Sequence, residues 1–219
     1  MFYDTPLSIT AFSTELGTFP TCAVVLPHQT HSATVAIVER DDMTEAELEG
    51  VDALITQQRG ICIGVRTADC VPILLYDPVQ QAIAAIHSGW KGTVQRIATH
   101  TIEQMTRTFG TQPHHLHAII GPSISAEVFQ VGEELVEAFS QARFPMEQIH
   151  TYRGERQVGD YTTSHHLDLW RANGWLLEQA GIPTEQITLT GICTYADPRF
   201  PSYRRDATQA RMITAIRQD

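Results

Sequence analysis

The feature that most constrains the fold is a series of short apolar runs with almost no polar alternation. Residues 71–76 and 81–87 are nearly continuous in apolar side chains. The first run ends at Asp77-Pro78 and the second at Ser88-Gly89. Such runs are typical of strands that are buried on both faces. Further short runs predict that the N-terminal third is rich in strands: residues 21–26, 33–38, 53–56 and 61–66.

Helical spacing of apolar residues begins later in the chain. Residues 93–109 carry apolar side chains three and four positions apart, and Gly110 stops the pattern. Three further segments predict helices: residues 132–140, 168–180 and 205–217. Single helices alternate with strands, but hairpin-like strand pairs also occur, which favours a mixed, layered α+β fold over a regular doubly wound sheet. Since no linker or repeat interrupts the chain, we expect one domain over residues 1–219.

Charge and cysteine usage limit the partners. The chain has 25 acidic and 15 Lys and Arg residues, a formal charge of −10. This balance argues against a broad surface for nucleic acid or an anionic membrane, although a local basic pocket stays possible. Four scattered cysteines, no signal-peptide pattern and no long apolar span predict a cytoplasmic protein with free thiols.

Polar residues gather at the ends of the predicted strands. A strand end followed by a glycine-containing turn is a common place for a site, because the scaffold is rigid and the turn is accessible. Four such segments stand out: residues 28–31, 66–70, 87–92 and 121–123. By contrast, His114, His115 and His117 follow a proline, and we expect them, like His165 and His166, to be solvated loop residues.

Three residues of these segments have the chemistry of metal ligands. His31, Cys70 and His87 offer two imidazoles and a thiol, which suit zinc or copper, and three ligands leave one coordination position open. Their separations are not those of a zinc finger, so the ligands would converge only on folding. From the residues alone, the spacing favours the other interpretation, in which Cys70 is a small core residue and the two histidines make surface or turn hydrogen bonds. His28 would be a neighbour or an alternative ligand.

Cations near these segments suggest an anion site. Lys91 lies between Gly89 and Gly92 at a predicted strand-to-helix turn, which could present backbone N–H groups to an anion. The spacing is not that of a Walker loop. Arg204-Arg205 is a tight arginine pair in an acidic chain, either solvated or a clamp for phosphate or carboxylate.

Taken in order, the motifs resemble one known family. They are Gln29-Thr30-His31, Thr67-Ala68-Asp69-Cys70-Val71-Pro72, His87-Ser88-Gly89-Trp90-Lys91-Gly92, Gly121-Pro122-Ser123-Ile124, Val131-Gly132, Cys193-Thr194 and Phe200-Pro201-Ser202-Tyr203-Arg204-Arg205-Asp206. Each is short, but their order and spacing are specific over nearly the whole chain. The chain resembles the laccase-domain family, also called polyphenol-oxidase-like or YfiH-type proteins, which are regarded as purine nucleoside phosphorylases with adenosine deaminase activity.

The resemblance implies a fold and a function. The fold is a single α+β domain of packed mixed sheets flanked by helices, a layered α/β/β/α sandwich. The function is zinc-dependent cleavage of adenosine, inosine or methylthioadenosine by phosphate, with possible deamination of adenosine. A small-molecule purine nucleoside is then the partner, and the oligomeric state stays open. The implied metal ligands are His31, Cys70 and His87; the acid/base candidates are Asp69 and His28; the cations available for phosphate are Arg66, Lys91, Arg204, Arg205 and Arg211.

The chain departs from the family pattern around this core. Glu15 occupies a position where family members commonly carry an arginine, and Lys91 replaces the arginine that usually precedes Gly92. Ser32, Ser123 and Ala210 replace a glycine, a cysteine and a glycine. These changes leave the metal triad intact but alter the residues expected to handle anions.

Three other functions therefore stay open. One is a copper-dependent phenol oxidase, the older family label. Another is a hydrolase with Cys70 as nucleophile and His87 as base. The third is a metal-binding interaction protein without catalysis.

Overall fold

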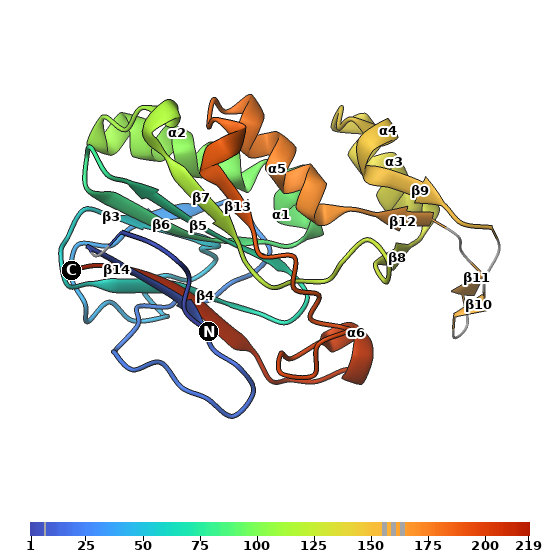
Figure 1. The fold of residues 1–219 in the computed structure, drawn as a ribbon, viewed down its shortest axis with the longest axis horizontal. Helices are drawn as coiled ribbons and strands as arrows, with labels where there is room; N and C mark the ends of the chain where they lie inside the picture. Colours follow the sequence, from blue (N-terminus) through green and yellow to red (C-terminus); the bar gives the residue numbers. More distant parts are fainter. Residues whose placement is uncertain (7, 155–156, 159–160, 163–164) are drawn as a thin grey trace.

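A six-stranded mixed sheet with strand order β13-β7-β5-β6-β3-β2 forms the centre of the molecule (Figure 1). The computed structural model describes residues 1–6, 8–154, 157–158, 161–162 and 165–219. The central strands β5 and β6 pair antiparallel, and all their residues are buried, as their continuous apolar runs predict. The strands of this sheet are β2 (Val35–Ile37), β3 (Ala53–Thr56), β5 (Val71–Asp77), β6 (Ala82–Ser88), β7 (His117–Ile120) and β13 (Ile187–Leu189).

A three-stranded antiparallel sheet packs on one face of the large sheet. It has the order β1-β14-β4, formed by Ile9–Ser13, Met212–Gln218 and Cys62–Thr67. Ile63 and Ile216 of the small sheet share a buried core with Leu74 of the large one. On its outer side, the small sheet packs against Cys22 and Val24.

Helices cover the opposite face of the large sheet (Figure 1). The helices on this face are α1 (Trp90–Val94), α2 (Ile97–Phe109) and α5 (Leu169–Gln179). Ile102 and Met105 of α2 and Leu176 of α5 belong to one core with the sheet residues. Burial of these apolar faces is what holds the helical layer on the sheet.

A smaller lobe extends from one end of this layer (Figure 1). A second three-stranded sheet, of order β8-β12-β9, carries helices α3 and α4. The elements of the lobe are β8 (Gln130–Val131), α3 (Glu133–Gln141), α4 (Met146–Ile149), β9 (His150–Tyr152), β10 (Gln157–Val158), β11 (Tyr161–Thr162) and β12 (His165–Leu167). The remaining helical elements are η1 (Pro113–His115), η2 (Thr184–Gln186) and α6 (Tyr203–Asp206).

The predicted α+β class and packed mixed sheets are confirmed. The runs at residues 33–38, 53–56, 61–66, 71–76 and 81–87 form β2 to β6, and the predicted helices 132–140 and 168–180 form α3 and α5. The helix predicted over residues 93–109 begins only at Ile97, after the short α1. The run 21–26 forms no strand; its Val25 makes a single bridge to Ile63.

The helix predicted over residues 205–217 is wrong. Only α6 is helical there, and Met212–Gln218 forms β14. Ile213, Thr214 and Ile216 are β-branched, which favours a strand. Moreover, β14 lies between β1 and β4, so both of its edges have backbone partners. The histidines at 165 and 166 lie on β12, and His117 begins β7, rather than in loops.

Within the described part of the chain, no helix has the length and apolar character needed to span a membrane.

Candidate metal centre and its cleft

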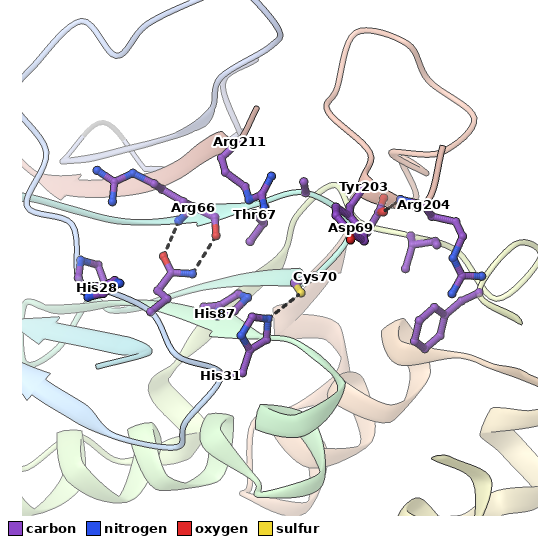
Figure 2. A pocket seen from close by; sticks show the side chains of 15 residues that line it. His28, His31, Arg66, Thr67, Asp69, Cys70, His87, Tyr203, Arg204 and Arg211 are labelled. Carbon is purple, nitrogen blue, oxygen red and sulfur yellow. Dashed lines mark hydrogen bonds between the residues drawn. The ribbon is translucent and has the colours of Figure 1, made fainter. Parts of the chain in front are cut away.

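His31, Cys70 and His87 come together at one end of the large sheet, although the chain separates them widely (Figure 2). Cys70 directly precedes β5, and His87 lies near the end of β6, where it pairs with Pro72. His31 lies in the loop before β2. Their nitrogen and sulfur donor atoms all lie within 4.8 Å of one another. The antiparallel β5–β6 register therefore places two ligands, and the loop brings the third.

The donor set fits a tetrahedral metal ion. Cys70 Sγ lies 3.9 Å from His31 Nε2, and the rings of His31 and His87 meet edge-on at 4.8 Å. Donors that sit roughly 2.0–2.3 Å from a zinc ion in tetrahedral geometry lie about 3.3–3.8 Å apart. Because the donor atoms lie within 4.8 Å of one another, a contraction of up to about 1.5 Å would bring them into that geometry, and three protein ligands would leave one position open.

Electrostatics at the centre favour the thiolate of Cys70. Burial raises the pKa of this thiol, but His87 and His31 outweigh burial and lower the pKa to about 6. Burial likewise lowers the pKa of His87, but the neighbouring Cys70 and Asp52 raise it to about 9. Because the thiolate is the form that binds metals, the histidines prepare Cys70 as a ligand.

Asp52 is a part of the site that sequence reasoning missed. It directly precedes β3, is fully buried, and accepts a hydrogen bond of 2.6 Å from His87 Nδ1. The signal in the sequence is a lone acidic residue at the start of an apolar strand. That signal does not reveal its partner, which lies 35 positions further along the chain.

A cavity of about 500 Å³ opens beside the three ligands, a volume suited to a small molecule. Figure 2 shows its walls, which carry both apolar and cationic side chains. Ile124, Phe129 and Tyr203 supply apolar and aromatic surface. Its cations are Arg66, Arg204 and Arg211.

Two of these arginines keep their charge uncompensated. Arg204 donates to the carbonyl oxygens of Val128 and Gln130, and Arg211 donates to those of Thr208 and Ala210. Among the described residues, no carboxylate lies within ion-pair distance of either guanidinium. Arg66, in contrast, pairs with Glu45 at 2.6 Å. The cleft therefore presents positive charge in an acidic protein, which favours an anionic ligand.

Lys91 and Arg205 are placed away from the cavity walls. The Lys91 ammonium lies over the Trp90 ring at 5.6 Å, on an exposed side chain. Arg205 donates to the carbonyl oxygens of Thr194 and Phe200 and pairs with Asp206. The geometry gives Arg205 a structural task, since it ties α6 to the preceding loop.

The two acid/base candidates, His28 and Asp69, both line the cavity. His28 is exposed, with Nδ1 hydrogen-bonded to Glu49. Asp69, in a left-handed backbone conformation (φ 83°), accepts from the Thr194 hydroxyl at 2.6 Å and from the Arg204 backbone N–H at 2.7 Å. Its carboxylate oxygens are thus engaged in holding Thr194 and helix α6, which carries Arg204. The other ring nitrogen of His28 can face a ligand.

Glu15, the residue in place of a family arginine, lies outside the cavity walls. It pairs with Arg199 at 3.7 Å and lines a separate depression near the N-terminus. Like-charge repulsion between Glu15 and an anion in the cleft is therefore not a feature of this arrangement.

The packed sheets, together with His31, Cys70 and His87 beside a basic cleft, define an α+β protein with a candidate metal site. The family described as multi-copper polyphenol oxidoreductase laccase matches residues 8–219, and the chain belongs to this family.

Several similar proteins carry the names of enzymes that act on purine nucleosides. The chain is 40% identical to a purine nucleoside phosphorylase of Bacteroides thetaiotaomicron, over 88% of this chain and 72% of that protein. It is also 40% identical to adenosine deaminase RL5 from an unknown prokaryotic organism, over 88% and 74% of the two chains. The fold is similar to the crystal structure of the Bacillus licheniformis hypothetical protein YfiH, with a TM-score of 0.79 at 28% identity, covering 90% of this chain and 74% of that one.

Proposed function

We propose that the protein is a zinc-dependent purine nucleoside phosphorylase that cleaves adenosine, inosine or methylthioadenosine with phosphate. The observation that carries the proposal is the juxtaposition of a three-ligand metal centre with a cleft whose Arg204 and Arg211 lack carboxylate partners among the described residues. A phosphate needs such uncompensated cations, and a nucleoside needs the apolar wall beside them. The names of the relatives support the same substrate class.

The reaction divides into tasks for these side chains. A phosphate oxygen bonds to C1′ of the ribose while the bond between C1′ and the purine nitrogen breaks, so the products are the free base and ribose 1-phosphate. Arg204 and Arg211 would hold the phosphate, and Phe129 and Tyr203 would pack against the base. His31, Cys70 and His87 would hold zinc, which supplies Lewis-acid stabilisation of negative charge.

Deamination of adenosine is the second proposed activity. The open coordination position and the relative named adenosine deaminase favour it. His28, with its Nδ1 held by Glu49, is the cleft residue best placed to move a proton. This activity needs water in place of phosphate, so the two reactions differ in their phosphate requirement.

Copper-dependent phenol oxidation has less support. Multicopper chemistry uses several clustered ligand sets, whereas the described residues contain one convergent group of three metal-ligating side chains. The proposed hydrolase with a free Cys70 nucleophile is incompatible with a Cys70 that holds zinc.

The test uses purified protein of known metal content. Adenosine, inosine and methylthioadenosine are incubated with and without phosphate, and free base, ribose phosphate and ammonia are followed. We expect base and ribose phosphate in equal amounts only when phosphate is present. Cys70→Ala should abolish this, while Cys22→Ala, which changes a cysteine packed on the outer side of the small sheet, should not. Absence of base release by zinc-loaded protein would overturn the phosphorylase proposal.

A further inference from the structure

We propose that Asp52 is the positioning residue of the metal centre: its buried carboxylate holds both the turn that carries His31 and the ring of His87. This inference rests on the metal site of the proposed function. The side chain of Asp52 is fully buried, and its two oxygens accept four hydrogen bonds. A buried carboxylate is costly unless it is fully hydrogen-bonded, and this one is.

Three of the four donors are consecutive backbone N–H groups. Thr30, His31 and Ser32 donate to Asp52 at 3.1, 3.1 and 2.7 Å. His31 itself has a positive φ of 62°, which is unfavourable for a residue with a Cβ atom. Successive N–H groups wrapped around an anion stabilise such a conformation. The carboxylate therefore holds the strained turn that aims His31 at Cys70.

The fourth donor is the ring of His87. Its Nδ1 donates to the same oxygen of Asp52 that accepts from the His31 backbone, at 2.6 Å. The proton is thereby assigned to Nδ1, which leaves Nε2 of His87 as the nitrogen available to a metal. Oδ1 of Asp52 thus fixes which ring nitrogen of His87 carries the proton, and it also holds the backbone of His31.

Backbone hydrogen bonds also hold Asp52 in place. The His87 N–H donates to the Asp52 carbonyl at 2.8 Å, and the Asp52 N–H donates to Thr34 at 3.0 Å. Strand β3 begins at the next residue and pairs with β6, which carries His87. The sheet therefore fixes the position of the Asp52 carboxylate, and the carboxylate in turn positions His31 and His87.

The experiment compares Asp52→Asn with Asp77→Asn. Asp77 is the matched control: it is also buried on the large sheet and accepts two backbone hydrogen bonds, from Val79 and Gln80, but it lies at the opposite end of β5. Zinc dissociation constants are measured by competition with a chromophoric chelator, beside thermal unfolding of the metal-free proteins. We expect Asp52→Asn to weaken zinc binding by about 10- to 100-fold, and Asp77→Asn to change it less than twofold.

A second measurement is independent of whether Asp52→Asn folds. Long-range 1H–15N correlation spectra of the zinc-loaded wild type should show the His87 proton on Nδ1. A proton on Nε2, or zinc affinity of Asp52→Asn within twofold of wild type, would overturn the role of Asp52. An equal loss of affinity in both variants would also overturn it, since general destabilisation would then explain the effect. Failure of the wild type to bind zinc would overturn the metal site itself, which separates the two proposals.

Discussion

Substituting alanine for Gly89 should damage the metal centre more than the fold. A Cβ atom at this position would lie 3.0 Å from Cys70 Sγ and 3.0 Å from His31 Cδ2. Ordinary contacts between such heavy atoms are about 3.5–4.0 Å. The added methyl group must therefore displace the side chains of Cys70 and His31 by a few tenths of an ångström. The backbone of Gly89 has φ −67°, so the effect comes from space and not from backbone strain.

The size of the effect follows from this overlap. Overpacking of a closely packed site costs about 1–3 kcal/mol. If the ligands move to relieve it, the same free energy appears as a loss of zinc affinity of roughly 5- to 150-fold, since about 1.4 kcal/mol is a factor of ten. The melting temperature of the metal-free protein should fall only slightly, because without the metal the ring of His31 is free to shift.

The assay is a zinc competition titration of Gly89→Ala beside calorimetry of the metal-free form. The useful comparison is Gly174→Ala, also a glycine-to-alanine change, in helix α5 and remote from the cleft. Wild-type zinc affinity in Gly89→Ala would refute the reasoning, because it would show that the ligands do not need the space beside this glycine. A large drop in stability with unchanged affinity would place the strain in the fold instead.

Three further predictions test other parts of the structure. Gly174→Ala should stabilise the protein by about 0.5–1 kcal/mol, since alanine favours a helix and its Cβ would meet only Arg171 at 3.9 Å; a lower melting temperature would contradict this. Arg211→Ala should raise the KM for phosphate about tenfold through loss of a charge-assisted contact, whereas Lys91→Ala, outside the cleft, should leave it within twofold; equal effects would argue against the assigned phosphate site. Burial raises the pKa of Tyr3 to about 12, so the tyrosine ionises first in the unfolded chain. Stability from Tyr3 should be fully present below pH 10 and be lost as the pH rises through 12, by about 2–3 kcal/mol, and Tyr3→Phe should remove this loss in denaturant titrations across that range.

Local pattern was sufficient for much of the fold. The runs that became β3, β5 and β6 are apolar on both faces, and only a sheet covered on both sides can bury them. The prediction failed for residues 205–217, because an apolar residue at every third or second position suits a helix or a strand equally well over so short a segment. This segment forms a strand because β1 and β4 offer hydrogen bonds to both edges of β14.

The sequence by itself determined the α+β class, and it pointed to His31, Cys70 and His87 as candidate metal ligands through motifs whose order is specific; the structure brings these three side chains together. Only the tertiary structure decided which charged residues reach the site. Arg204 and Arg205 are adjacent and chemically identical, yet one lines the cleft and the other ties backbone carbonyls together. Asp52 could not be recognised either, because its partners lie 20 to 35 positions away. Local periodicity specifies which face of an element is buried, but the direction of a polar side chain depends on donors and acceptors that only folding brings beside it.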